Sequence, residues 1–269
     1  TYFKYTPDSM YMISYGGGPT KGTIEVFNAE SGELIWENSQ THYRIVVDAG
    51  VSPDSKLLAT PSIDQTVRIW ELATGKQVVQ PLMHDGGPWQ AVFSPDMMKL
   101  VTASDLNDVQ VWDLNNGKLL NSPTSIDSDP GAVAFSQDGS FIRVLNKEGK
   151  ILEFQTNNAS IDPILLTHED KIQDFDLHPN GERLVSVSEG GVVNLWGLSP
   201  IAHLNSSNKI KLPRMCVFVD NGKKLFIAAG EGWSNFLRWY VLDSESLEVL
   251  NEGSLPTFTN QVQISLDAN

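Results

Sequence analysis

The sequence contains a single cysteine, Cys216, which excludes an intrachain disulfide framework. Cys216 lies in the apolar run "MCVFV", so we predict a buried and unreactive thiol. Long apolar segments are also missing. The longest uninterrupted run, "LFIAA" at 225–229, is too short to span a bilayer, and we expect no membrane insertion.

Positive charge is scarce as well. The chain has 19 Lys and Arg residues against 33 Asp and Glu residues, which gives a formal net charge of −14. A protein that binds a nucleic-acid backbone needs cations clustered on one face. We therefore expect no nucleic-acid partner, and we attribute the acidity mainly to solubility.

No segment shows a sustained helical period, and no signal-peptide pattern opens the chain. Short runs such as "WQAVFS", "KLVTAS" and "VQVW" are rich in β-branched and aromatic residues, and turn sequences such as "PD" and "NNG" separate them. These features predict an all-β protein. We expect a cytoplasmic location, or a nuclear one in a eukaryote. Because the first residue is Thr1, we expect a fragment of a longer, multidomain chain.

The strand pattern repeats with a fixed period. The phrase "FSPD" at 93–96 has counterparts at 5–8, 51–54, 135–138 and 177–180, and the last residues of four of these turns are 42 positions apart. Three histidines each precede a tryptophan by 28 residues, and a serine follows each histidine after 20 residues. Agreement between independent landmarks indicates an architectural repeat rather than a catalytic motif.

Four short strands in about 42 residues match one blade of a β-propeller, a four-stranded antiparallel sheet. Such a sheet has two apolar faces and buries them by stacking against neighbouring sheets. Six complete repeats are visible, and an opening strand near 262–266 starts a seventh. We expect one propeller domain over residues 1–269, derived from a seven-bladed parent.

The sequences "WEL" at 70–72, "WDL" at 112–114 and "WGL" at 196–198, together with the "FSPD" turns, resemble the WD-repeat family of β-propellers. The resemblance implies a buried hydrogen-bonded relay of His, Ser or Thr, Asp and Trp in a blade. The set is complete once, while Leu106 and Gly190 replace the Asp in two other repeats. The predicted relay residues are His42, Ser62, Asp64 and Trp70; His84, Ser104 and Trp112; and His168, Ser188 and Trp196.

Three patterns could suggest chemistry. His42, Ser62 and Asp64 superficially resemble a hydrolase triad, but a nucleophile does not need copies on successive blades. The stretch "GGGP" at 16–19 lacks the residues of a phosphate-binding loop. A group of carboxylates and histidines has no recognised metal-ligand spacing; it comprises His168, Glu169, Asp170, Asp174, Asp176 and His178. We therefore predict no catalytic residue, no metal site and no cofactor.

The same resemblance implies that partners bind on the face formed by the loops between blades and the turns between second and third strands. The implied positions lie three and five residues after each relay His and one before each relay Asp. Trp89 and Trp233 are the preferred anchors, since both lie outside the repeated tryptophan register. The other predicted contacts are Ile45, Val47, Ile63, Asp105, Asp129, Lys171, Gln173, Glu189, Leu212, Arg214, Phe258 and Asn260.

The sequence favours a non-catalytic scaffold that binds a protein or peptide and belongs to a larger chain or complex. Two alternatives remain open. One is a propeller enzyme, or a metal or small-ligand binder, at the mouth of the central channel. The other is a blade array that serves self-assembly.

Overall fold

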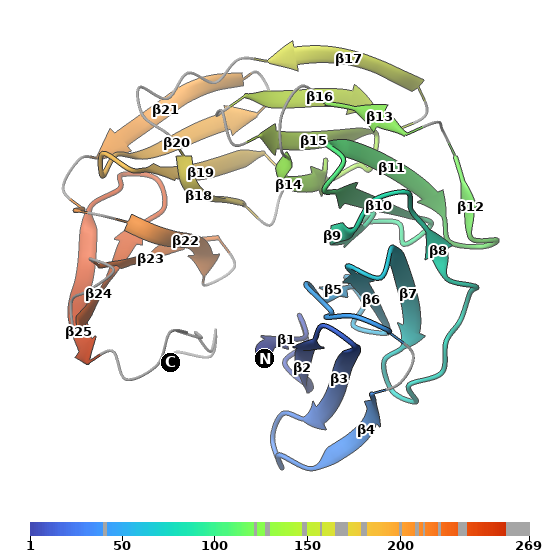
Figure 1. The fold of residues 1–269 in the computed structure, drawn as a ribbon. Coiled ribbons are helices and arrows are strands. Elements are labelled where there is room, and N and C mark those ends of the chain that lie inside the picture. The colour runs from blue at the N-terminus through green and yellow to red at the C-terminus, as the bar shows by residue number, and fades with distance from the viewer. Residues whose placement is uncertain are drawn as a thin grey trace. The chain divides into compact units, whose positions relative to one another are not determined.

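A computed structural model describes most of the chain, and all regular secondary structure in the described residues is β-strand (Figure 1). The described ranges are 1–39, 42–120, 123–126, 130–146, 150–156, 158–164, 172–178, 182–198, 201–207, 210–211, 213–219, 222–230 and 236–256. They contain no helix that could cross a membrane. The all-β prediction is confirmed, and the strand expected near 262–266 lies outside the described residues.

The strands form six antiparallel sheets, and the chain divides into two compact units. The first unit is 1–146 with 152–163, and the second is 147–151 with 164–269. In each sheet the strands follow one another in chain order, as successive hairpins require. Five of the six described sheets have the expected four antiparallel strands, and the third has a fifth strand.

The first unit contains four sheets. The first has β1 (Tyr2–Tyr5), β2 (Tyr11–Gly18), β3 (Lys21–Asn28) and β4 (Leu34–Asn38). The second has β5 (Gly50–Val51), β6 (Leu57–Ser62), β7 (Thr66–Glu71) and β8 (Leu82–Met83). The third has β9 (Pro88–Phe93), β10 (Lys99–Ser104), β11 (Asp108–Asp113) and β12 (Lys118–Leu119), with β13 (Thr124–Ser125) also paired to β11. The fourth has β14 (Pro130–Phe135), β15 (Phe141–Asn146), β16 (Ile151–Gln155) and β17 (Asn158–Ile164).

The second unit contains two sheets. The fifth sheet has β18 (Ile172–Leu177), β19 (Arg183–Ser188), β20 (Val193–Leu198) and β21 (Ile201–Ser207). The sixth has β22 (Pro213–Val219), β23 (Lys224–Ala229), β24 (Phe236–Asp243) and β25 (Val249–Pro256).

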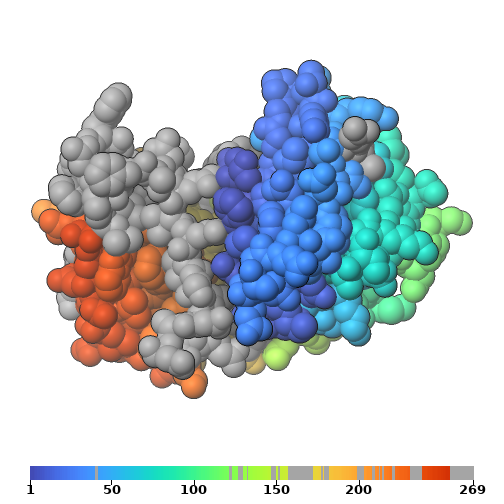
Figure 2. Space-filling view, turned by 90° about the horizontal axis from the view of Figure 1, so that it is seen from below, coloured from blue at the N-terminus to red at the C-terminus, as the bar shows by residue number. Residues whose placement is uncertain are grey.

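Within each unit the core lies between successive sheets. Strand β3 buries one face through Gly22, Ile24 and Val26, whereas β6 in the next sheet is buried on both faces. The first strand of a sheet packs on the preceding sheet, as β9 does on β5 and β6, and β22 on β18 and β19. In the space-filling view the surfaces of the first three sheets, from blue to teal, run into one another without a break (Figure 2). Stacking of sheets therefore buries the apolar faces that one sheet would leave in water.

The "SPD" phrases form the tight turns between first and second strands. Ser94 donates a hydrogen bond from Oγ to Asp96 Oδ1 at 2.6 Å, and the same carboxylate oxygen accepts the Met98 N–H at 3.0 Å. The bond from Ser94 lowers the pKa of Asp96. Met97 between them has φ 59°, a left-handed conformation that this short capped turn requires. Because this turn needs these polar atoms at fixed places, its sequence repeats.

Trp36 on β4 connects the first sheet to the second. Its indole Nε1 donates to the Leu72 carbonyl oxygen at 2.6 Å, and a Cβ added to Gly75 would lie 2.7 Å from the indole ring. Replacing Trp36 with phenylalanine should lower the free energy of unfolding by about 1 kcal/mol, because the Leu72 carbonyl loses its donor. Urea denaturation followed by circular dichroism measures the change.

The control for this prediction is Trp36→Leu, which removes the same hydrogen bond and also the contact with Gly75. It should cost more than the phenylalanine variant. If neither substitution lowered the unfolding midpoint, Trp36 would not be what joins the two sheets.

Candidate functional site

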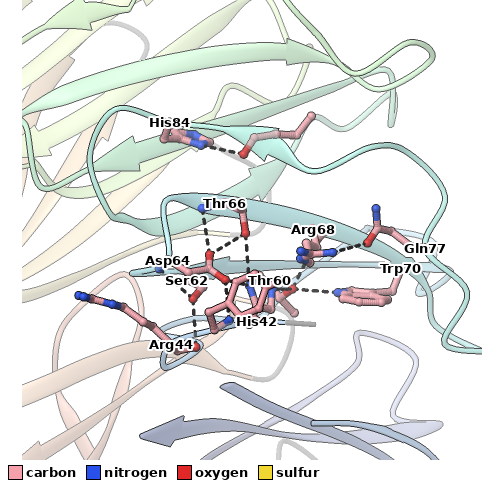
Figure 3. A network of polar contacts seen from close by, with 12 residues as sticks. His42, Arg44, Thr60, Ser62, Asp64, Thr66, Arg68, Trp70, Gln77 and His84 are labelled. Carbon is pink, nitrogen blue, oxygen red and sulfur yellow. Dashed lines mark hydrogen bonds and ion pairs between the residues drawn. The ribbon is translucent and has the colours of Figure 1, made fainter. Parts of the chain in front are cut away.

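His42 lies in the connection between the first and second sheets and is buried. Its Nδ1 lies 2.9 Å from Asp64 Oδ2, and its Nε2 lies 2.9 Å from Thr60 Oγ1 (Figure 3). Trp70 completes the chain, since its Nε1 donates to Thr60 Oγ1 at 2.8 Å. A carboxylate only accepts, so the Nδ1–H of His42 donates to Asp64. Every donor in this chain has an acceptor.

Asp64 fixes two loops at once. Its carboxylate accepts the Tyr43 N–H at 3.0 Å, the Thr66 N–H at 3.1 Å and the Thr66 hydroxyl at 2.6 Å, besides the His42 ring. Burial alone raises the pKa of Asp64, but the hydrogen bonds from His42, Thr66 and Tyr43 lower it to about 2. The carboxylate is therefore ionised at neutral pH, and its oxygens are occupied by the protein itself.

The hydroxyl of this network is Thr60, not Ser62. The Ser62 hydroxyl donates instead to the Arg44 carbonyl oxygen at 3.1 Å, and no hydrogen bond joins it to His42 among the described contacts (Figure 3). The assignment of Ser62 to the relay is thus corrected. Thr60 and Ser62 are two residues apart on β6 and share one face of the sheet, so spacing alone fits both. The Thr60 hydroxyl is fully buried and accepts the Trp70 N–H, so a substrate could not reach it as it must reach the nucleophile of a hydrolase triad.

The third and fifth sheets show the same correction. Trp112 Nε1 donates to Thr102 Oγ1 at 3.0 Å, and His84 Nε2 lies 2.8 Å from that oxygen. Trp196 Nε1 donates to Ser186 Oγ at 2.8 Å. The hydroxyl therefore precedes the tryptophan by ten residues in all three sheets. His168 of the fifth sheet lies outside the described residues.

The serines chosen from spacing stabilise turns instead. Ser62 Oγ accepts the Asp64 N–H at 3.2 Å, and Ser104 Oγ accepts the Leu106 N–H at 3.2 Å. The Ser104 hydroxyl donates to Asp108, and Ser188 Oγ accepts the Val192 N–H at 3.3 Å. These serines hold the turns between second and third strands, where several partner contacts are predicted.

His84 shows what the network loses when the carboxylate is absent. The repeat position of Asp64 is occupied by Leu106, and His84 Nδ1 contacts the carbonyl oxygen of Leu82 at 3.1 Å instead. Burial lowers the pKa of His84, and the Leu82 carbonyl and the nearby Asp108 and Asp85 only partly oppose it. The imidazole is therefore neutral at physiological pH and serves packing beside Trp112, whose ring centroid is 5.0 Å away.

Three of the predicted contact positions coincide with β-bulges. The pairing of β9 with β10 shifts at Trp89, that of β18 with β19 at Gln173, and that of β22 with β23 at Arg214. A bulge leaves its extra residue unpaired and re-aims its side chain. The Gln173 side chain is exposed, and that of Arg214 lies outside the described part of the structure.

Trp89 is only partly exposed. Its side chain packs against the core between the third and fourth sheets, and its buried indole Nε1 has no hydrogen-bond acceptor among the described residues. The first anchor predicted from the sequence thus contributes to packing, and its role in binding stays a prediction. The second anchor, Trp233, lies outside the described residues, as do Asp129, Lys171, Leu212, Phe258 and Asn260.

The structure brings several of the other predicted contacts together. Gln173 Nε2 donates to Glu189 Oε1 at 2.7 Å in the second unit. In the first unit Ile63 and Asp105 both lie against Gly87, whose N–H donates to Asp105 Oδ1 at 2.8 Å. Ile45 and Val47 are half-buried beside the first of these turns. Positions that are remote in the sequence thus meet at one end of the sheets.

Two exposed side chains at this end were not among the predicted contacts. Tyr43 is 72% exposed and Leu106 is 57% exposed, while the predicted contact Ile63 is 37% exposed. Tyr43 directly follows His42, and Leu106 takes the place of the relay Asp, so the departure from the repeat at 106 was the available signal. We call the surface formed by these loops the loop strip; its exposed residues are Tyr43, Ile63, Asp85, Asp105 and Leu106, and the buried Gly86 and Gly87 lie between them.

The carboxylates considered as metal ligands bind the neighbouring strand instead. Asp174 Oδ2 accepts the Cys216 N–H at 2.8 Å, and Asp176 Oδ2 accepts the Phe218 N–H at 2.7 Å. Burial is the main cause that raises the pKa of Asp174 to about 6, and the charge of Asp176 adds to it. No group of three His, Cys, Asp or Glu residues in the described part of the chain could hold a metal ion.

Cys216 itself is buried, as predicted. Burial raises the pKa of its thiol well above the usual value, and the nearby charges of Asp174 and Asp176 act in the same direction. The thiol is therefore protonated at neutral pH and is a poor nucleophile.

Comparisons with known proteins agree with this geometry. The family described as "WD domain, G-beta repeat" matches residues 37–71 and 162–197. The crystal structure of the Cps50 (Swd1) β-propeller domain of Myceliophteria thermophila superposes with a TM-score of 0.76 at 12% identity, covering 94% of this chain and 85% of that chain. No curated protein sequence matches the chain. The chain therefore contains two stretches that match the WD-repeat family model, and its fold is that of a WD-repeat β-propeller.

Proposed function

We propose that this chain is a non-catalytic interaction module that binds a protein or peptide on the loop strip. The WD-repeat propeller fold is consistent with a protein-interaction scaffold, and protein binding is typical of the family. The observation that carries the proposal is the exposure of Tyr43, Ile63 and Leu106 on adjoining loops. Large apolar side chains that gather on a surface mark sites of association, because contact with a partner removes them from water.

The loops of the strip are joined to one another by hydrogen bonds. Tyr43 N–H binds the carboxylate of Asp64 at 3.0 Å, and the Ile63 N–H binds the Ile45 carbonyl at 3.3 Å. The next loop is held from both sides, since Gln65 Nε2 donates to the Asp85 carbonyl at 2.9 Å and the Asp105 N–H donates to the Gly87 carbonyl at 3.1 Å. A partner would therefore meet a preorganised surface, which reduces the entropy lost on binding.

The buried network explains why these exposed residues are held in place. His42 and Asp64 bind within the second sheet, and the residues next to them in the chain, Tyr43 and Ile63, are exposed at its end. The polar groups of this network, which could otherwise have reacted with a substrate, form hydrogen bonds with one another. What remains for a ligand is the outer surface of the loops, which suits recognition rather than chemistry.

The other predicted contacts belong to the same proposal. Gln173 and Glu189 occupy the equivalent end of the fifth sheet and are exposed there. The anchors Trp89 and Trp233, and a single propeller domain over residues 1–269, remain predictions.

Removing the exposed side chains of the strip should abolish partner capture. In the double variant Tyr43→Ser with Leu106→Ser, we expect at least a tenfold loss of the proteins that the wild-type chain retains from a native extract, because the apolar contacts are gone. Quantitative mass spectrometry of cross-linked eluates measures the loss. The unfolding midpoint should stay within a few degrees, since both side chains lie mainly in solvent.

The matched control is Met10→Ser with Met98→Ser. These methionines are 59% and 47% exposed and lie in the turns between first and second strands, at the opposite end of their sheets. The control should retain the same proteins as the wild type. Equal retention by both double variants, or equal loss in both, would contradict the proposed surface.

A further inference from the structure

The central part of the loop strip combines two exposed carboxylates with two glycines that are buried beneath neighbouring side chains. Residues 85–87 run between the turn that carries Ile63 and the turn that carries Asp105 and Leu106. A Cβ added to Gly86 would lie 2.4 Å from Asp105 Oδ1 and 2.6 Å from Leu106 Cγ. One added to Gly87 would lie 3.4 Å from Ile63 Cα. The two glycines therefore let this loop lie flat between two aliphatic side chains.

The carboxylates at this place lack cationic partners. Asp85 and Asp105 are both exposed, and neither makes an ion pair with any residue in the described ranges. Asp105 Oδ1 is bound to the Gly87 N–H, which fixes the carboxylate, while no bond to Oδ2 is seen from the described residues. Elsewhere in this unit the partly buried Asp54 and the exposed Asp96 each have a lysine within 4 Å, at 3.2 and 3.9 Å.

Uncompensated charge of one sign beside apolar side chains defines the chemistry of a matching partner. A lysine or arginine offers the opposite charge to Asp85 and Asp105, and its methylene stem can cover Ile63 or Leu106. An acidic segment would instead meet both carboxylates and a chain whose net charge is −14. The exposed Tyr43 ring, whose loop is bound to Asp64 in the same strip, adds a surface for an arginine or an aliphatic side chain.

From this arrangement, and resting on the proposed function, we infer that the loop strip recognises a basic peptide segment in which lysine or arginine adjoins aliphatic residues. The cationic head binds at Asp85 and Asp105 Oδ2, and the neighbouring aliphatic side chains pack on Ile63 and Leu106.

The test probes the complete 269-residue chain with an array of immobilised nonamer peptides of random sequence. Wild-type protein should select peptides in which Lys or Arg adjoins Leu, Ile or Val. The variant Asp85→Asn with Asp105→Asn keeps an acceptor for the Gly87 N–H but removes both charges. We expect it to bind the selected peptides at least fivefold more weakly in fluorescence anisotropy, with a smaller loss of affinity on adding salt.

The control is Glu30→Gln with Glu33→Gln, which removes the same charge at the opposite end of the first sheet, in the turn after β3. It should bind within twofold of the wild type. Selection of acidic or uncharged peptides, absence of any selected peptide, or equal weakening by the control would overturn the inference. If Tyr43→Ser with Leu106→Ser abolishes binding while Asp85→Asn with Asp105→Asn does not, the surface is retained and only the cationic partner is wrong.

Discussion

Replacing Asp64 with alanine should lower the free energy of unfolding of the first unit by about 4 kcal/mol. The Asp64 side chain is 4% exposed and accepts hydrogen bonds from Tyr43, Thr66 and the His42 ring. Without it, two main-chain N–H groups and one imidazole N–H lose their acceptor in a place that water reaches poorly. Urea denaturation followed by tryptophan fluorescence measures the total. Hydrogen exchange of 57–71 shows whether the loss is located in the second sheet.

The sequence supplies its own control at the same repeat position. Leu106 replaces the relay Asp in the third sheet and is exposed, so Leu106→Ala should change the stability by less than about 0.5 kcal/mol. The conservative variant Asp64→Asn should lie between the two, because an amide oxygen can still accept one N–H. A small effect of Asp64→Ala would mean that the network does not hold the loop strip.

The pH dependence of the network follows from the lowered pKa of Asp64. The pKa of this carboxyl is about 2 in the folded chain and 3.8 ordinarily, so the unfolded chain binds the proton more readily. The stabilisation from Asp64 is therefore fully present above pH 3.8 and is lost as the pH falls towards about 2. Near neutral pH the Asp64 carboxylate keeps its charge, which suits a structural role.

Much of the fold could be predicted from the sequence because its signals are local. A serine and an aspartate two residues apart make the capped turn at Ser94 and Asp96, and the turn looks alike in each repeat. The tryptophans at 70, 112 and 196 lie on third strands, where each packs into the core of its sheet. Regular spacing of such local features is sufficient to place the strands.

The detailed site could not be predicted in the same way, because it depends on contacts between strands and on the paths of loops. Thr60 and Ser62 are equivalent by strand period, and only the cross-strand position of Trp70 shows that Thr60 joins the network. The exposure of Tyr43 depends on the path of a loop that has no periodic pattern. The sequence does not predict the β-bulge at Trp89. At this bulge the side chain of a predicted surface anchor packs against the core.

The two carboxylates of β18 show a further limit of sequence reasoning. Asp174 and Asp176 were candidate metal ligands because of their chemistry, yet each accepts an N–H from the residue 42 positions later. Gln90 does the same in the first unit, where its Oε1 accepts the Val133 N–H at 2.8 Å. In both units a side-chain oxygen thus satisfies an N–H that no strand pairs, and it joins the first strands of successive sheets.

This arrangement predicts that Asp174→Asn stabilises the second unit at neutral pH. Asp174 is partly buried with Asp176 beside it, and its pKa of about 6 means that folding favours the protonated form. Each pKa unit corresponds to about 1.4 kcal/mol, and partial contact with solvent reduces the total, so the gain at about pH 7.5 should be about 2 kcal/mol. An asparagine carries no charge, and its oxygen can still accept the Cys216 N–H.

The pH dependence of stability that Asp174 causes is opposite in sign to that of Asp64, and measuring stability against pH can test it. Between pH 3.8 and about 6 the folded chain binds the Asp174 proton more readily than the unfolded chain, so wild-type stability falls as the pH rises through this range. The advantage of Asp174→Asn should therefore be largest above pH 6 and should vanish below about pH 4. Hydrogen exchange of the strands at 172–177 and 213–219, measured at several pH values, follows the second unit alone.

The control is Asp243→Asn in the same unit. Hydrogen bonds from Ser246 and Glu245 lower the pKa of Asp243, so that variant should gain no stability at neutral pH. If Asp174→Asn raised the free energy of unfolding equally at all pH values, the amide would improve packing, and burial of the charged carboxylate would not be the cause.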